Sequence, residues 1–142
     1  MNLFAYHQGG HGNGRLFYSA YVPGAGWQPD TQVQNVGMSE SPSAVEYGGN
    51  LFVFHQGGSD NGQLFCSVFD GANWHADAQV PAVGMSDSPS AIVWNGDLHV
   101  FHQGTGEDGG LWFAYFDGTG WHNDTQVQNV GMSESPAMLA TA

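Results

Sequence analysis

Hydrophobic residues in this chain fall in short runs that are rich in β-branched and aromatic side chains. Clusters of Gly, Pro, Asn and Asp separate the runs, and no helical period is visible. Such runs between turn residues are typical of β-strands. In one part of the chain the pattern predicts strands at 88–94, 97–103, 110–116 and 121–127. Asn95-Gly96 and Asp117-Gly118 supply the positive φ of tight hairpins, so these strands are expected to form an antiparallel meander.

This four-stranded unit occurs three times. The tryptophans Trp27, Trp74 and Trp121 are spaced by 47 residues, and Gly-Met-Ser recurs at 37, 84 and 131. His-Gln-Gly recurs at 7, 55 and 102, where the first interval is 48 because the turn at 22–26 is one residue longer than its counterparts. Residues 30–42 reappear letter for letter as 124–136. The pattern therefore predicts one repeat domain, 1–142, with copies at approximately 1–46, 47–93 and 94–142.

Several predicted strands are apolar on both faces, such as Leu51-Phe52-Val53-Phe54. A strand of this kind suits a sheet that is packed between two others. A four-stranded sheet that repeats and is covered on both faces is the unit of a β-propeller. We therefore expect an all-β fold of propeller blades.

The amino-acid sequence of the repeat resembles that of a known family. The sequence SPSAV, a turn and NLFVFHQGG, followed by GQLFCSVFDGANW, resembles the blades of bacterial and fungal propeller lectins and of sialidase-type repeat proteins. The turn at 60–65 is similar to part of the Asp-box of such blades, although Glu107 and Gly12 stand where the middle copy has Asp60. The resemblance implies a β-propeller fold and carbohydrate binding.

The copies are out of phase with the blades. The chain opens in the second strand of a blade, at 3–8, and finishes in a first strand, at 135–142. Three twisted sheets cover too little angle to close a ring, and an open ring exposes unpaired strand edges. We therefore predict a homodimeric six-bladed ring, in which each terminal strand completes the partner's first sheet. The alternative is a monomeric β-trefoil, which also has three repeats of about this length.

Charge limits the partners. The chain has 13 acidic residues against one basic residue, Arg15, which gives a net charge of −12. Nucleic acid, anionic lipid and phosphorylated ligands are bound mainly through basic groups, so none of them is expected, and neither is membrane insertion. The single cysteine, Cys66, is expected in the core. No signal peptide is recognised after Met1, so the default expectation is the cytoplasm, or release by a non-classical route.

Candidate binding residues are repeated polar and aromatic side chains. In a meander, the connections between the second and third strands and between successive blades fall on one face, and binding groups usually ride on such loops. Amide, imidazole and carboxylate groups there suit a neutral polyhydroxyl ligand. These polar candidates are His7, Gln8, Glu40, His55, Gln56, Asp87, His102, Gln103 and Glu134. Aromatic candidates for stacking on sugar rings are Phe17, Phe65, Trp112, Trp27, Trp74 and Trp121.

Each of these positions also has a structural interpretation. The tryptophans and the phenylalanines can pack between sheets, the His-Gln pairs can tie a loop to a neighbouring blade, and the acidic loops can cap backbone amides. The repeated histidines are too far apart to share a metal ion, and His7 and His11 lack an evident third ligand. Neither a metal nor a cofactor is therefore expected.

The function that the sequence favours is multivalent binding of neutral sugars by a lectin with equivalent sites. One arginine excludes the three-arginine cluster of sialidases, and a catalytic centre generally departs from repeat symmetry, so an enzyme is not expected. Fucose-binding members of the resembling family pair an arginine with a glutamate, and the repeated positions here have no such arginine. A non-catalytic structural or engineered propeller fragment, and a glycoside hydrolase-like enzyme, are the alternatives.

Overall fold

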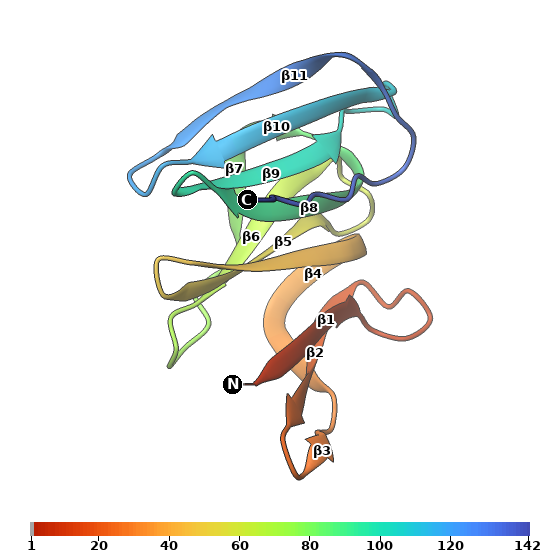
Figure 1. Ribbon diagram of the computed structural model, residues 1–142. Helices are drawn as coiled ribbons and strands as arrows, with labels where there is room; N and C mark the ends of the chain where they lie inside the picture. Colours follow the sequence, from red (N-terminus) through yellow and green to blue (C-terminus); the bar gives the residue numbers. More distant parts are fainter. Residues whose placement is uncertain (1) are drawn as a thin grey trace.

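The computed structural model describes residues 2–142, which form three antiparallel sheets stacked side by side (Figure 1). We call these sheets blades 1, 2 and 3 in chain order. Every sheet is a meander whose strands are hydrogen-bonded in chain order, except that the short β3 pairs with β2 and β4 lies next to β2. Residues 2–142 contain no helix, and so no helical segment suited to crossing a bilayer.

Blade 1 is the incomplete sheet at the N-terminus. It contains β1 (Leu3–Gln8), β2 (Arg15–Val22), β3 (Gly26–Trp27) and the first part of β4 (Thr31–Tyr47). β1 pairs with β2, and β2 pairs with both β3 and β4. Within residues 2–142, β2 is the one strand that pairs with β1, so the other edge of β1 is unpaired.

Blades 2 and 3 are complete four-stranded sheets. Blade 2 contains the second part of β4, β5 (Asn50–Gly57), β6 (Gln63–Phe69) and β7 (Ala78–Gly84). Blade 3 contains β8 (Ser86–Trp94), β9 (Asp97–Gln103), β10 (Gly110–Phe116) and β11 (Trp121–Gly131). β4 is long because it leaves blade 1 at Gly37 and enters blade 2 at Met38 without a break. This continuity joins the first two blades into one hydrogen-bonded sheet.

The tight turns follow the predicted chemistry. Asn95 and Gly96 both have positive φ, as a two-residue hairpin between β8 and β9 requires, whereas at Asp117-Gly118 only the glycine does. In blade 3 these turns lie at one end of the sheet, and the β9–β10 connection lies at the other (Figure 1). The two kinds of connection therefore emerge on opposite faces of the molecule.

The core lies between the blades. Between blades 2 and 3, the buried side chains include Phe54, Leu64, Val80 and Leu98. Between blades 1 and 2 they include Leu16, Val33, Met38 and Val53. Val53 and Phe54 are neighbours in β5 and face opposite blades, which confirms that this strand is apolar on both sides because both sides are covered.

The trefoil alternative is wrong. Hydrogen-bonded strand pairs stay within a blade, except that β4 is shared, and the sheets meet face to face through side chains. A trefoil barrel would require strands of different copies to pair around a closed barrel. The exact limits assigned to the three copies, 1–46, 47–93 and 94–142, stay a prediction.

The C-terminal segment differs from the prediction. Residues 135–142 were expected to form a strand, but they run without strand structure along β8 (Figure 1). They have no second strand beside them, and an isolated segment leaves half of a ladder unmade. Even so, the segment lies where the next blade would begin. The amide of Ser88 donates to the Ser135 hydroxyl at 3.0 Å, as the amide of Ser41 donates to the Ser88 hydroxyl at 2.9 Å.

Candidate functional site

Two clefts open between neighbouring blades, on the face that carries the long connections. We call the cleft between blades 1 and 2 cleft 1, and the cleft between blades 2 and 3 cleft 2. Their volumes are about 770 Å³ and about 420 Å³. The walls of cleft 1 include Gln8, Asn13, Ser39, Glu40 and Asp60. The walls of cleft 2 include Glu40, Gln56, Asn61, Asp87 and Glu107.

The two clefts are built from equivalent positions of the repeat. Gln8, Asn13 and Glu40 of cleft 1 correspond to Gln56, Asn61 and Asp87 of cleft 2. In both clefts one wall comes from the connection after the second strand of one blade, and the other wall from the same connection of the next blade. The connection between the two blades forms the floor. The prediction that these loops share a face therefore corresponds to two real cavities.

An acidic residue with positive φ projects from every inter-blade connection. Glu40, Asp87 and Glu134 have φ values of 59°, 59° and 63°. Side chains other than glycine rarely adopt this conformation, and it costs of the order of 1 kcal/mol or more, so its presence in all three copies points to a role for the carboxylate or for the bend. Glu40 and Asp87 line the clefts.

A buried serine hydroxyl fixes the walls of each cleft. The Ser39 hydroxyl donates to the Gly57 carbonyl at 2.8 Å and accepts from the Asp60 amide at 2.7 Å. Ser86 makes the same two bonds to Gly104 and Glu107, at 2.7 Å and 2.8 Å. One hydroxyl therefore ties each inter-blade connection to the loop of the following blade. The cleft shape is fixed before any ligand arrives.

The glutamines stabilise the same loops. The side-chain Oε1 of Gln56 accepts from the Gly62 amide at 2.9 Å, and the side-chain Nε2 donates to the backbone carbonyl of Asp87 at 3.3 Å. The Gln103 amide group donates to the Asp87 carboxylate at 2.7 Å. Gln56 and Gln103 are almost completely buried. Of the predicted glutamines, Gln8 and Gln56 line clefts, and Gln103 orients a carboxylate that lines one.

The histidines belong to a repeated polar network inside the blades. Nδ1 of His55 lies 2.9 Å from the Gln56 carbonyl oxygen, and Nε2 lies 3.0 Å from the Asp77 carboxylate, which also accepts from the Ser67 hydroxyl at 2.8 Å. His102 has the same arrangement with Gln103 and Asp124. The side chains of His55 and His102 are inaccessible to solvent. These two rings therefore hold the strands together and do not reach a cleft.

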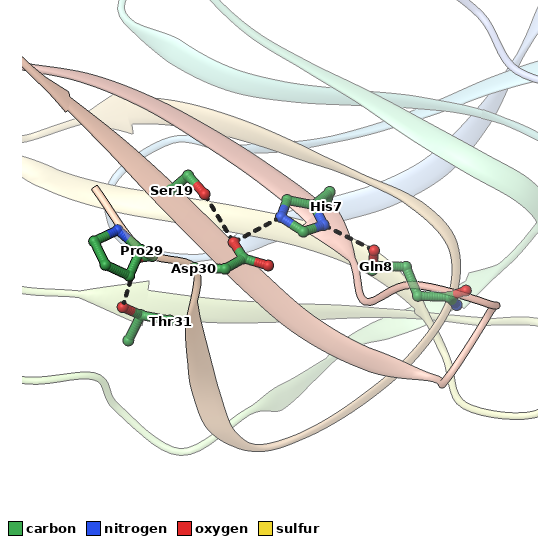
Figure 2. A network of polar contacts seen from close by, with 6 residues as sticks. All are labelled: His7, Gln8, Ser19, Pro29, Asp30 and Thr31. Carbon is green, nitrogen blue, oxygen red and sulfur yellow. Dashed lines mark hydrogen bonds and ion pairs between the residues drawn. The ribbon is translucent and has the colours of Figure 1, made fainter. Parts of the chain in front are cut away.

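The equivalent network of blade 1 is open to solvent. His7 bonds Gln8 and Asp30, and Ser19 bonds the same Asp30 oxygen (Figure 2). The His7 side chain is 43% exposed, because no blade covers this face. The hydrogen bond to the Gln8 carbonyl and then that to Asp30 raise the pKa of His7. Although partial burial acts in the opposite direction, the bonds from His7 and Ser19 lower the pKa of Asp30.

These networks do not have the order of a nucleophilic triad. In such a triad the serine hydroxyl bonds the histidine, which then bonds the aspartate. Here the Ser19 and Ser67 hydroxyls donate to the aspartate itself, and blade 3 has Ala114 at the serine position. The arrangement fixes the imidazole rings between two strands. Neither the Ser19 hydroxyl nor the Ser67 hydroxyl donates a hydrogen bond to an imidazole that could act as its general base.

The aromatic candidates of the third strands lie outside both clefts. Phe65 stacks on His55 with centroids 6.0 Å apart, and Phe17 stacks on His7 at 6.2 Å. The indole N–H of Trp112 donates to Asp108 at 3.1 Å. All three lie on the blade face that carries the histidine network. Their use in binding stays a prediction.

The repeated tryptophans pack between blades. The ring of Trp74 lies 6.2 Å from that of Tyr6 in blade 1, and Trp121 lies 5.8 Å from Phe54 in blade 2. Trp27 is the exception, with 55% of its surface exposed, because no blade within residues 2–142 covers this side of blade 1. None of the three lines a cleft, so the structural interpretation accounts for Trp74 and Trp121.

Two sets of repeated residues were missed by the sequence reasoning. Asp30, Asp77 and Asp124 hold the histidines, and their signal is recurrence three residues after each repeated tryptophan. Asn13, Asn61 and Asp108 accept a backbone amide two residues ahead in each copy. Their side chains pack against Gly9, Gly57 and Gly104, where any Cβ would collide with them. This packing explains the glycine of each His-Gln-Gly.

Other reactive groups are inert or dispersed. Cys66 is buried in the core between blades 2 and 3, where burial raises the pKa of its thiol far above the usual value and keeps it protonated. In the described part of the chain, no three His, Cys, Asp or Glu side chains come together as a metal site would require.

Sequence comparison finds no family model and no curated protein that matches this chain. Structure comparison finds solved lectins. A fucose lectin from Kordia zhangzhouensis, in complex with methyl-fucoside, superposes with a TM-score of 0.66 at 18% identity, over 91% of each chain. A variant of the Aleuria aurantia lectin, in complex with Fucα1-6GlcNAc, superposes with a TM-score of 0.67 at 17% identity. The match covers 96% of this chain and 45% of the Aleuria chain. Another Aleuria structure, described as a six-bladed β-propeller, superposes with a TM-score of 0.64 at 15% identity.

These likenesses show the fold. The chain has the blade fold of a β-propeller, as the repeat sequence predicts, and the solved lectins share that fold. It spans about half of the Aleuria chains and nearly all of the Kordia chain. At identities below a fifth, the ligand and the assembly need separate arguments.

Proposed function

We propose that this protein is a non-catalytic lectin that binds neutral sugars in the clefts between its blades. The observation that carries the proposal is the repetition of one cleft design, with an acidic residue in a strained conformation at the same place each time. Carboxylate, amide and hydroxyl groups along the walls match the alternating donors and acceptors of a sugar. Repeated equivalent sites favour binding over catalysis, because binding gains from multiplicity.

The charge of the clefts supports a neutral ligand. Glu40, Asp60, Asp87 and Glu107 line cleft 2, and neither lysine nor arginine lines either cleft; the imidazole of His7 lies on the wall of cleft 1. A sialic or uronic acid would bring a further negative charge into this field. Two of the solved neighbours are complexes with methyl-fucoside and with Fucα1-6GlcNAc, so fucose is among the neutral sugars to test.

We also propose that two copies of this chain form a six-bladed ring. Positions that are buried in blades 2 and 3 are exposed where blade 1 and the C-terminal segment lack a neighbour. Leu98 of blade 3 is inaccessible, whereas the equivalent Leu3 of blade 1 is 59% exposed. Leu139, which corresponds to Val45, a partly buried residue that packs against the core, is 83% exposed. These surfaces fit one another, because the same positions already fit between blades 1, 2 and 3.

The repeat fixes the register of the proposed junction. In blades 2 and 3, Val45 pairs with Phe52 and Ile92 with His99. The same spacing places Leu139 opposite the partner's Phe4, at the free edge of β1. There the leucine faces a pocket of about 460 Å³ whose walls include Phe4, Tyr6 and Trp74. The exposed Trp27 would meet the partner's Phe101, as Trp121 meets Phe54.

Replacement of Asp87 by Asn tests the binding proposal. Asn tolerates positive φ and keeps an acceptor for Gln103, so the fold should persist while the charged acceptor in cleft 2 is lost. Hydrogen bonds to a charged group contribute about 1.5–3 kcal/mol, so affinity at this cleft should fall about 10- to 100-fold. The measurement is isothermal titration with methyl fucoside, methyl galactoside, methyl mannoside and methyl glucoside, after a glycan array has identified which of them binds.

Glu46 supplies the control. It lies in β4 on the wall of the pocket around Trp74 and lines neither cleft, so Glu46→Gln removes one charge without changing sugar affinity. A folded protein that binds no neutral glycan on the array would end the lectin proposal. Equal losses in Asp87→Asn and Glu46→Gln would show that the clefts are not the site.

A further inference from the structure

We propose a third sugar-binding cleft, which neither chain contains by itself and which forms where blade 3 of one copy meets blade 1 of the other. This inference rests on the lectin function and on the six-bladed ring proposed above. It adds a composite site and states which residues each chain supplies. In the ring, four clefts then lie within chains and two lie at the junctions.

One chain already holds one wall and the floor of this cleft in place. The amide of Met132 donates to the Gly109 carbonyl at 2.8 Å, as Met85 does to Gly62 at 2.9 Å at the base of cleft 2. Glu134 follows with a φ of 63°, the conformation of Glu40 and Asp87. The connection after blade 3 therefore bends as the other two do, and it places a carboxylate at the same point.

The wall on this side repeats the walls of the complete clefts. Gln103, Glu107 and Asp108 stand where Gln56, Asp60 and Asn61 line cleft 2. The Asp108 carboxylate accepts the Gly110 amide at 2.8 Å, which is the bond that Asn61 makes to Gln63 at 2.9 Å. In the proposed ring, the blade that faces this wall is blade 1 of the partner.

Ser133, the counterpart of Ser39 and Ser86, indicates which segment forms the missing wall. Ser39 and Ser86 each bond a glycine carbonyl and a loop amide of the following blade. Ser133 occupies the same position and is exposed. By the repeat spacing, its hydroxyl should donate to the partner's Gly9 carbonyl and accept from the partner's Gly12 amide. The missing wall is thus the partner's loop between β1 and β2.

The junction cleft differs chemically from the other two. The opposing wall carries Ser59 and Asp60 in cleft 1, and Gly106 and Glu107 in cleft 2. At the junction the same two positions are the partner's His11 and Gly12. His11 has a φ of 60°, like Ser59 at 59°, so the loop has the same bend. An imidazole thus replaces a small side chain, and the acidic side chain of this wall is absent.

The two kinds of cleft should therefore differ in affinity for one sugar. On the wall that the partner supplies, the junction cleft offers a ring that can stack or donate, where clefts 1 and 2 have the carboxylates of Asp60 and Glu107 as acceptors. A titration of the ring should give two classes of site in a ratio of two to one.

Counting sites tests this inference. The parent chain is titrated at a concentration where it is assembled, with whichever of the four methyl glycosides binds. We expect three sugars per chain. Leu139→Asp, which should separate the copies, reduces the count to two and leaves clefts 1 and 2 intact. His11→Trp fills the junction cleft and also reduces the count to two, with the ring mass unchanged by ultracentrifugation.

Ser59→Trp is the matched control, because it places the same side chain on the equivalent wall of cleft 1. Ser59→Trp should remove cleft 1, whereas His11→Trp removes the junction cleft. The sites lost in the two variants should therefore differ in sugar affinity. Two sugars per chain in the assembled parent would overturn the composite cleft while leaving the lectin function standing. If titration with the four glycosides shows no heat of binding and the glycan array shows no bound sugar, both the composite cleft and the lectin function are contradicted.

Discussion

We expect the Leu139→Asp variant to sediment as a single chain of 15.1 kDa, whereas the parent chain sediments at twice that mass. Leu139 is the most exposed large hydrophobic residue in the described part of the chain, so the change costs the isolated chain little stability. In the proposed ring the leucine is buried against the partner's Phe4. Burial of a leucine is worth about 2–3 kcal/mol and occurs twice per ring, so the dimer should be weakened about 10³- to 10⁴-fold.

Ala140 provides a control next to this site. It corresponds to Glu46 of blade 2, where a charged side chain is accommodated. Ala140→Glu therefore adds a negative charge to the same segment and should leave the mass of the assembly unchanged. If the parent chain remains a single copy at every concentration, or if Leu139→Asp does not change its mass, the ring described here does not form. A mass of three or more copies would instead indicate a different closure.

We expect Asp77→Ala to lower the free energy of unfolding by about 2–4 kcal/mol, and the melting temperature by roughly 10 °C. The substitution leaves Nε2 of the inaccessible His55 and the buried Ser67 hydroxyl without their shared acceptor. An unpaired buried polar group costs about 1–3 kcal/mol, and two are created here. Thermal and urea denaturation followed by circular dichroism measure the change.

Asp30→Ala is the matched comparison, because Asp30 accepts the same two bonds from His7 and Ser19 in blade 1. When Leu139→Asp holds the chain as a single copy, this network faces solvent, and its loss should cost less than about 1 kcal/mol. Similar costs for the two substitutions would show that burial is not what makes the network important. In the assembled parent, Asp30→Ala should become more costly, because the partner's blade 3 covers it.

The strands could be predicted closely because local signals determine them. The structure has β9 and β10 at the predicted residues, since a hairpin turn or a glycine-rich loop marks each of their ends. β11 continues to Gly131, four residues past the prediction, because it curves into the connection to the next blade. The terminal segment was predicted as a strand from its letters alone. A strand also needs a partner, which the letters do not supply.

The site was predicted less well because it depends on contacts between distant strands. The loops that form the clefts could be placed on one face from the meander alone. The roles of His55 and His102 could not, because each depends on an aspartate 22 residues away, Asp77 just before β7 and Asp124 in β11. Bulges between the third and fourth strands shift that register, and the pattern of hydrophobic residues does not reveal them. The recurrence of the aspartate was the only available signal.

A crystal structure of this chain with the methyl glycoside that the array selects is the most direct test of the account. It should show six blades in a ring of two copies, with sugar between neighbouring blades beside Glu40, Asp87 and Glu134. Sugar stacked on Phe17, Phe65 and Trp112 with the clefts empty would contradict the site proposed here.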